Sequence, residues 1–159
     1  MVRNMREAAR HAMGRTSGRA AERDPQGQAA AQARLKASGL RPTRQRLELA
    51  GLLFQGHDRH VTAESLHDEV TRAGVKVSLA TVYNTLHQFT GAGLLRQVVV
   101  DASRSYFDTN VHDHQHFFHE DEGRLIDIPG ETIAVTNVPT PPDGLAVDRV
   151  DVVVRVKRA

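Results

Sequence analysis

Histidines gather in one short stretch of the sequence. Four of the nine histidines lie within the eight residues H-D-H-Q-H-F-F-H, namely His112, His114, His116 and His119. In an extended chain, side chains two positions apart lie on the same side, so the first three imidazoles share one face. Neutral imidazole binds Zn, Fe and Mn ions and also haem iron. The spacing therefore favours a ligand site over a solvated loop.

The residues around this stretch supply further groups for a ligand. Asp108 and Asp127 are close enough in sequence to add hard carboxylate oxygens, and Phe117–Phe118 offers an apolar wall that suits a flat porphyrin better than an ion. The absence of cysteine excludes thiolate zinc sites, iron–sulfur clusters, disulfides and thiol nucleophiles. Any metal must therefore be held by nitrogen and oxygen ligands.

The sequence carries none of the common catalytic motifs. It has no nucleophile elbow, glycine-rich phosphate loop or H-E-x-x-H helix. A cluster of histidines and carboxylates can also build a hydrolytic metal site, and a metal-buffering protein would use the same residues. Both alternatives leave the front half of the chain unexplained, so we expect a regulator and not an enzyme, with a His-rich metalloenzyme as the rival.

Helical patterns precede the histidines. Apolar spacing, capping residues and glycines predict helices over residues 25–38, 43–56, 62–74 and 78–93. The fourth helix is expected to pack through one face, which contains Leu79, Val82, Leu86 and Phe89. Extended runs over 94–100 and 105–109 then flank a polar turn at 101–104, which predicts a hairpin. Helices followed by a hairpin are typical of a winged helix-turn-helix domain that binds double-stranded DNA.

The pattern changes after residue 110. Strands are expected over 123–128 and 150–156, with a proline-rich crossing between them. About fifty residues bury too little apolar surface to be stable alone, so we expect the valine-rich last strand to pair with a second copy in a homodimer. The expected organisation is α+β: a disordered basic leader over 1–24, a winged-helix DNA-binding domain over 25–110 and a small α/β dimerisation and ligand-sensing domain over 111–159.

Charge is distributed unevenly along the 159 residues. Residues 1–40 contain 8 basic and 3 acidic side chains, whereas residues 111–159 contain 5 and 9. This asymmetry suits a protein that meets a polyanion through its front part. The sequence has no apolar run long enough to cross a bilayer and no signal peptide, so we expect a cytoplasmic protein without a membrane partner.

The fourth predicted helix presents short polar side chains opposite its apolar face. Thr81, Asn84 and Gln88 are suited to contact base edges, because amides pair with adenine and the threonine methyl meets thymine. Arg41, before the second helix, and Arg96, in the hairpin, are expected to meet phosphates. A solvated helix face is the alternative, and the adjacent hairpin favours DNA.

Four segments of the sequence resemble a known family. L-R-P-T-R-Q-R-L, H-V-T-A-E-S-L, S-L-A-T-V-Y-N-T-L and H-D-H-Q-H-F-F are similar to the ferric uptake regulator (Fur) superfamily of bacterial metal-sensing repressors. The resemblance runs from about Leu40 to the last residues. Within the superfamily, the H-F-F-H-E-D-E-G-R-L-I-D-I-P run and the P-P-D-G-L-A-V-D-R-V-D-V-V-V-R run are most like the iron response regulator (Irr) branch, which senses haem.

The resemblance implies roles for individual residues. It places Tyr83, Arg41 and Arg96 near operator DNA, and it assigns one interdomain metal site to a set of five residues: His60, Asp108, His114, His116 and Asp127. The family's thiolate zinc site is impossible without cysteine, and Asp113, Gln115 and Ala134 make a poor second site. The Cys-Pro haem motif of some Irr proteins is also missing, so haem would bind through histidine, with His112, His114, His116 and His119 as candidates.

The sequence thus predicts a regulator of iron or haem homeostasis genes. Its DNA binding is expected to respond to haem or iron at the His-rich interdomain site. The alternative within the superfamily is a repressor that senses Fe(II), Mn(II) or Zn(II) directly.

Overall fold

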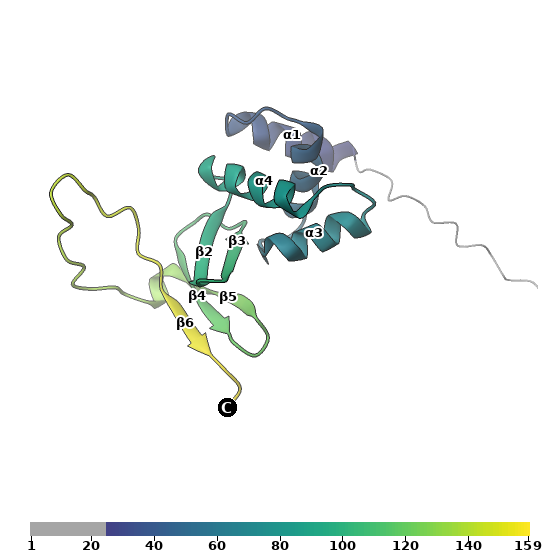
Figure 1. The fold of residues 1–159 in the computed structure, drawn as a ribbon. Helices are drawn as coiled ribbons and strands as arrows, with labels where there is room; N and C mark the ends of the chain where they lie inside the picture. Colours follow the sequence, from purple (N-terminus) through teal and green to yellow (C-terminus); the bar gives the residue numbers. More distant parts are fainter. Residues whose placement is uncertain (1–24) are drawn as a thin grey trace, which may run out of the picture.

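The computed structural model describes residues 25–159, so the expected leader over residues 1–24 lies outside the described part of the chain. In chain order the elements are α1 (Pro25–Ala37), α2 (Arg44–Leu53), β1 (His60–Val61), α3 (Ala63–Arg72), α4 (Leu79–Gly91), β2 (Arg96–Asp101), β3 (Arg104–Asp108), β4 (His114–His119), β5 (Arg124–Pro129), the short helix η1 (Gly130–Thr132) and β6 (Val153–Val156). The helices gather at one end of the molecule and β4, β5 and β6 at the other (Figure 1).

Side-chain caps fix where the helices begin, as the sequence predicts. The Thr43 hydroxyl accepts from the Arg46 N–H at the start of α2, and Ser78 accepts from the Thr81 N–H at the start of α4. At α3, Thr62 and Ser65 form a reciprocal capping box. Each cap satisfies an N–H that the helix itself cannot pair. The start of α4 is therefore fixed by residues next to it in sequence.

The helices share one hydrophobic core with the adjoining strands. Its fully buried members include Leu49, Leu66, Leu86, Phe89 and Phe107. One expectation for α4 is wrong, because Leu79 is 37% exposed, whereas the other members of the predicted inner face are buried. Leu79 occupies the first turn, beyond the core that α4 crosses.

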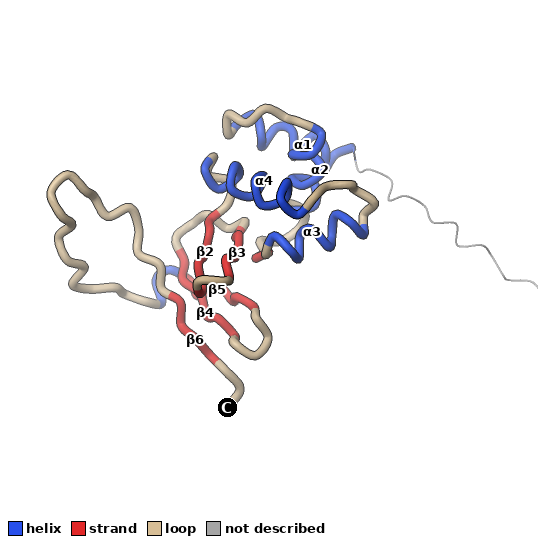
Figure 2. Tube along the Cα trace, viewed as in Figure 1, coloured by secondary structure: helices blue, strands red, loops and turns tan. Residues whose placement is uncertain are grey.

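The strands form two three-stranded sheets, and every strand except β1 follows the four helices in the chain (Figure 2). The first has the order β1-β3-β2, in which Asp108 lies opposite both His60 and Arg96. The second has the order β5-β4-β6, with β4 and β5 antiparallel and β4 and β6 parallel. The sequence predicts the β2–β3 hairpin, β5 and β6, but neither β1 nor β4 was expected as a separate strand.

A second apolar cluster joins the two sheets. It contains Val98, Val100 and Tyr106 from the β2–β3 hairpin and Phe118 and Leu125 from β4 and β5. The Tyr106 hydroxyl donates to the Gly123 carbonyl at 2.6 Å. One face of the hairpin is therefore packed on the second sheet and is not free to meet another molecule.

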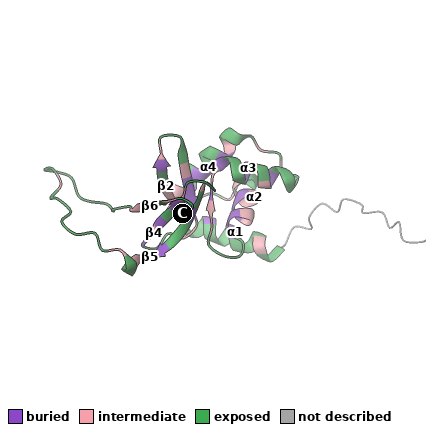
Figure 3. Ribbon diagram, turned by 90° about the horizontal axis from the view of Figure 1, so that it is seen from below, coloured by how far each residue is buried: buried purple, intermediate pink, exposed green. Residues whose placement is uncertain are grey.

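A long irregular segment connects η1 to β6. Residues 133–152 form no helix or strand and are mostly exposed (Figure 3). Prolines at 139, 141 and 142 disfavour both kinds of regular structure. Within residues 25–159, no helix is long and apolar enough to cross a membrane.

Candidate metal centre

Five ligating side chains meet between the two sheets. His60 comes from β1, Asp108 from the end of β3, His114 and His116 from β4, and Asp127 from β5. Each offers one ligand atom, and these atoms all lie within 4.8 Å of one another. The structure therefore brings together the five residues that the resemblance groups in one site.

Strand pairing positions these side chains. The β1–β3 register sets His60 beside Asp108, and the β4–β5 register sets His116 beside Asp127. His114 and His116 are two positions apart on β4, so their imidazoles lie on the same face. The set is thus defined by backbone pairing in both sheets.

The two carboxylates lie at the middle of the cluster. Asp108 Oδ2 lies 2.8 Å from His114 Nε2, 3.1 Å from His116 Nε2 and 3.3 Å from His60 Nε2. Asp127 Oδ1 lies 2.8 Å from His60 Nε2 and 3.5 Å from His114 Nε2. All three imidazoles therefore turn Nε2 toward the same small volume.

Access to this volume is one-sided. The side chains of Asp108, His114 and His116 are at most 5% exposed, whereas that of Asp127 is 40% exposed. The His60 side chain lies between these limits at 14%. An ion can therefore enter past Asp127 and still be screened from water on its other sides.

The electrostatics of the site favour an ion pair when no metal is bound. Burial alone would raise the pKa of Asp108, but the hydrogen bond with His116 and the nearby His60 imidazole hold it far below its usual range. Burial alone would lower the pKa of His60, but the carboxylates of Asp108 and Asp127 outweigh it and raise that pKa above its ordinary value. Protons and a cation therefore compete for the same negative charge.

The residues fit a single metal ion. His60 Nε2 is buried and has no aligned hydrogen bond despite its close carboxylates, as expected for an atom directed at a common point and not at one partner. His114 Nδ1 lies 2.7 Å from the His112 carbonyl, to which it can only donate, and this leaves Nε2 as the ligand atom. Three imidazole nitrogens and two carboxylate oxygens suit divalent first-row metals.

The structure separates the four histidines of the H-D-H-Q-H-F-F-H stretch. The expectation of three imidazoles on one face is wrong for His112, because β4 begins only at His114 and the His112 side chain is exposed outside the cluster. His119 lies on the opposite face of β4 from His116, since the two are three positions apart. The third imidazole at the centre is that of His60.

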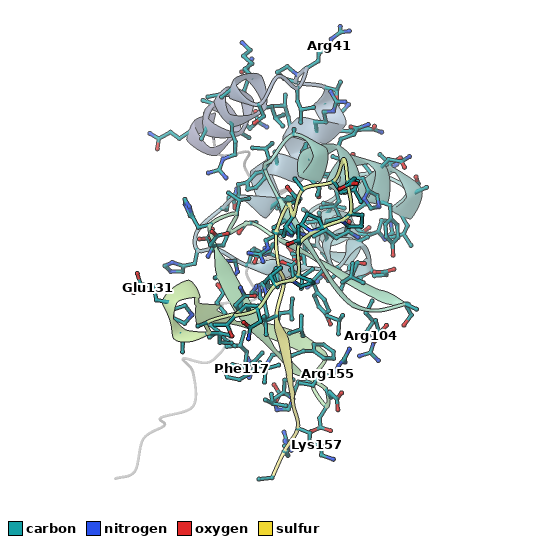
Figure 4. All side chains as sticks on the ribbon, turned by 90° about the vertical axis from the view of Figure 1, so that its left-hand side faces the viewer. Arg41, Arg104, Phe117, Glu131, Arg155 and Lys157 are labelled. Carbon is teal, nitrogen blue, oxygen red and sulfur yellow. The ribbon has the colours of Figure 1, made fainter. Side chains whose placement is uncertain are left out.

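The residues expected to read bases lie on one exposed side of α4. Tyr83 and Asn84 are exposed and Thr81 is half-buried. The Tyr83 hydroxyl donates to Glu64 Oε1 at 2.6 Å, which raises the pKa of Tyr83 and lowers that of Glu64. Arg41 is exposed at the helical end of the molecule, and its side chain projects outward from it (Figure 4). These four residues are all at least partly exposed to solvent.

Two polar contacts on this side were not foreseen from the sequence. Arg46 donates from Nε and Nη2 to the Gln88 amide oxygen at 3.0 and 2.9 Å. That oxygen is thereby occupied, whereas the amide of Asn84 carries no such contact in the described residues. Glu64 places a carboxylate beside Tyr83. Both contacts join residues of different helices, so spacing within one helix gives no signal for them.

Arg96 does not lie where a phosphate contact requires it. Its side chain is 7% exposed and is paired with Asp151, and it also donates to the His114 carbonyl at 3.1 Å. The expectation that Arg96 meets phosphate in this arrangement is therefore wrong. The cause is the packing of the hairpin on the second sheet, which turns this strand inward.

Comparisons with known proteins identify the family and the fold. The model of the ferric uptake regulator family matches residues 37–141. The ferric uptake regulation protein of Shigella flexneri is 35% identical over 100 residues, which cover 62% of this chain and 68% of the relative. The peroxide-responsive repressor PerR of Staphylococcus aureus is 33% identical over 95 residues, which cover 60% of this chain and 64% of the relative.

Solved structures of ferric uptake regulators share the fold. The regulator from Pseudomonas aeruginosa with manganese has a TM-score of 0.60 at 24% identity, and the match covers 80% of this chain and 97% of that one. The Vibrio cholerae regulator has a TM-score of 0.62 at 24% identity, with 80% and 98% covered. The family match and the fold together show that this chain belongs to the ferric uptake regulator family, whose members are metal-responsive transcription regulators and not enzymes.

Proposed function

We propose that this chain is a cytoplasmic, homodimeric regulator of iron homeostasis genes whose affinity for operator DNA is set by a divalent metal ion at the candidate metal centre. The observation that carries the proposal is the origin of the five ligands. His60 immediately precedes α3 in the helical part, whereas His114, His116 and Asp127 belong to the second sheet. An ion bound to all of them holds the two parts in one arrangement, and this gives it a means to change DNA affinity.

The ligand set supports iron or manganese ahead of zinc. Structural zinc sites are almost always four-coordinate, whereas five nitrogen and oxygen donors converge here. Carboxylate oxygens also favour Mn(II) and Fe(II) relative to softer ions. Zn(II) generally binds such sites more tightly than either, so the response of DNA binding to each ion, and not metal affinity alone, has to identify the physiological metal.

Haem is the second candidate ligand. The four imidazole and carboxylate groups around Asp108 are too close together to admit a porphyrin between them. A different surface supports the haem proposal: the half-buried His119 and the exposed Phe117 lie on the same outer face of β4. They would give an axial imidazole next to a flat apolar surface, with the exposed His112 as a further candidate.

The DNA-binding part of the proposal rests on α4. Thr81 and Asn84 would contact base edges in the major groove, Tyr83 would lie at the edge of that contact, and Arg41 would meet a phosphate. All four side chains are at least partly exposed on the same end of the molecule.

If haem does not occupy it, the outer face of the second sheet would be buried in the homodimer. Phe117 and Ile126 are paired across β4 and β5 and are 37% and 36% exposed. Val154 pairs with Phe117 on the same face, and β6 is an edge strand whose far side has no neighbour in the described residues. An apolar face beside an open edge is suited to a second copy of the same strand.

The proposal is tested with metal-free protein and a duplex selected by the Mn(II)-loaded protein from a random-sequence pool. Fluorescence anisotropy with Fe(II) under anaerobic conditions, Mn(II), Zn(II) and haemin measures the operator affinity in each state. We expect Fe(II) or Mn(II) to raise the affinity for the selected duplex over that for a scrambled one. Equal affinity with and without every ion would contradict metal control, and a change with haemin alone would assign the response to haem.

A further inference from the structure

Valines and charged residues alternate in strand β6 and just before it. Val154 and Val156 lie on the outer face of the second sheet. The inner face, toward the β2–β3 hairpin, carries Val153 and Arg155, and Asp151 precedes them on the same side. Charged side chains on an inner face lose hydration, so they need partners there. The residues that pair with these charged side chains show which part of the protein the inner face of β6 contacts.

Three charged residues of this segment contact one strand of the hairpin. Asp151 pairs with the Arg96 guanidinium, and the Arg155 guanidinium donates to the Val100 carbonyl. Arg149 donates from Nη2 to the Gln97 carbonyl at 3.0 Å and from Nε to Asp151 Oδ2 at 2.8 Å. We call Arg149, Asp151 and Arg155 the β6 clamp.

The pairing between Arg96 and Asp151 is the most buried contact of the clamp. Burial alone would raise the pKa of Asp151, but Arg96 and Arg149 outweigh it and lower that pKa. A buried ion pair adds little net stability over an apolar pair of the same shape, because both charges lose hydration. Its geometry is nevertheless restrictive, since Arg96 donates at the same time to the carbonyl of the metal-ligating residue His114.

Strand β2, which the clamp residues contact, connects α4 to the metal centre. β2 begins shortly after α4 ends at Gly91, and Arg96 lies opposite Asp108 in the sheet register. The clamp residues lie next to β4, which carries His114 and His116. Polar contacts therefore connect the second sheet to β2 in addition to the candidate metal centre.

We propose that the β6 clamp positions the DNA-binding part on the second sheet and is required to couple metal occupancy to DNA affinity. Arg96 is then a positioning residue within the protein, and its partner is Asp151. The inference rests on the proposed metal-controlled DNA binding, and it adds a second connection between the parts that touches neither the ion nor DNA.

The test compares Asp151→Asn and Arg149→Met with Lys157→Met in the full chain. Lys157 lies just after β6 and is exposed, so its substitution removes one positive charge without changing the clamp. Arg149 is 43% exposed, and its replacement is not expected to impair folding. For each variant we would measure Mn(II) affinity, operator affinity with and without Mn(II), and amide hydrogen exchange along β2.

We expect both clamp variants to bind Mn(II) with unchanged affinity and to lose most of the metal-induced gain in operator affinity, a gain that is roughly 5–150-fold in typical allosteric systems. Amides of β2 should exchange faster in both variants, and Lys157→Met should match the parent. A full metal-induced gain in both clamp variants would overturn the inference. If Asp151→Asn does not fold, Arg149→Met decides.

Failure of the proposed function would be recognised separately. If the parent protein shows no metal-induced gain, metal control is wrong for this chain. Hydrogen exchange then still tests the contact itself: unchanged exchange of β2 amides in Asp151→Asn and Arg149→Met would show that the clamp does not hold the hairpin.

Discussion

His60 Nε2 lies 2.8 Å from Asp127 Oδ1, although the two residues belong to different sheets. Asp108 Oδ2 lies 2.8 Å from His114 Nε2 and 3.1 Å from His116 Nε2, both on β4. Among the ligands that the described residues provide, His60 is the one from β1, the strand preceding α3. Loss of His60 should have a different effect from loss of a ligand on the second sheet.

Replacing His116 with alanine should weaken Mn(II) binding, because it removes a ligand. Loss of a residue that only hydrogen-bonds a metal ligand typically weakens binding roughly 10–100-fold, so we expect at least that decrease. His60→Ala should leave a partly coordinated ion on the second sheet and reduce the metal-induced gain in operator affinity more than metal affinity. Metal titrations with and without operator DNA measure both effects. Normal metal binding by His114→Ala and His116→Ala would contradict the site.

Asn84→Ala should reduce discrimination between the selected and scrambled duplexes by about 1–3 kcal/mol, since an amide can pair with two atoms of one base. Arg41→Ala should weaken binding to both duplexes alike and flatten the salt dependence, because a phosphate contact carries no sequence information. Anisotropy titrations at several salt concentrations distinguish these results. An unchanged preference in Asn84→Ala would show that α4 does not read bases.

The metal-free protein should lose stability as pH rises above about 6.5, the ordinary pKa of histidine. The pKa of His60 is raised in the folded protein, so its stabilising contribution is fully present below the unfolded-state pKa and is lost as pH rises through the folded-state pKa. The lowered pKa of Asp108 acts in the opposite direction at acidic pH, below about 3.9. Urea unfolding with a chelator at pH 6 to 9 measures the slope, which His60→Gln should reduce.

Gly130→Ala should disturb the backbone that leads into the metal ligands. A Cβ at position 130 would lie 2.6 Å from the Asp113 carbonyl oxygen, and Asp113 directly precedes His114. We expect a loss of about 1–3 kcal/mol in the free energy of unfolding, as for other overpacked sites, together with weaker Mn(II) binding. Gly51→Ala is the control, because nothing lies within 4 Å of its added Cβ and alanine favours the helix. Equal behaviour of the two variants would refute the close contact.

Val154→Lys should dissociate the proposed dimer, because it places a charge at the centre of the apolar outer face of the second sheet. Val99→Lys is the matched control, since Val99 is 62% exposed on the hairpin. Light scattering after size-exclusion chromatography gives the mass of each variant. A dimer that persists in Val154→Lys at micromolar concentration would place the interface elsewhere.

Local signals account for the features that the sequence predicts well. Thr43, Thr62 and Ser78 cap helices through atoms only three residues away, so their pattern is sufficient to place the starts. The two-residue strand β1 has no comparable signal, because only its long-range pairing with β3 defines it. His60 was therefore placed at the centre by family resemblance and not by spacing.

The sequence was least informative where two sheets meet. Arg96 has the charge and the hairpin position expected of a residue that contacts phosphate. Nothing within its own strand indicates that its charge is paired with Asp151. The alternation of valine and charge around β6 correctly predicts a strand, but it does not indicate which face is inside. That choice depends on partners from β2, which are distant in sequence.

The parallel pairing of β4 and β6 has a consequence for the order of folding. The β4–β5 hairpin closes over a short turn, and its formation is fast because little chain entropy is lost. β6 returns to β4 across the long irregular segment, and Asp151 lies 55 residues from Arg96. Contacts of such separation form late. The face that carries His114, His116 and Asp127 can therefore assemble first, and the return of β6 is the step that completes the native protein.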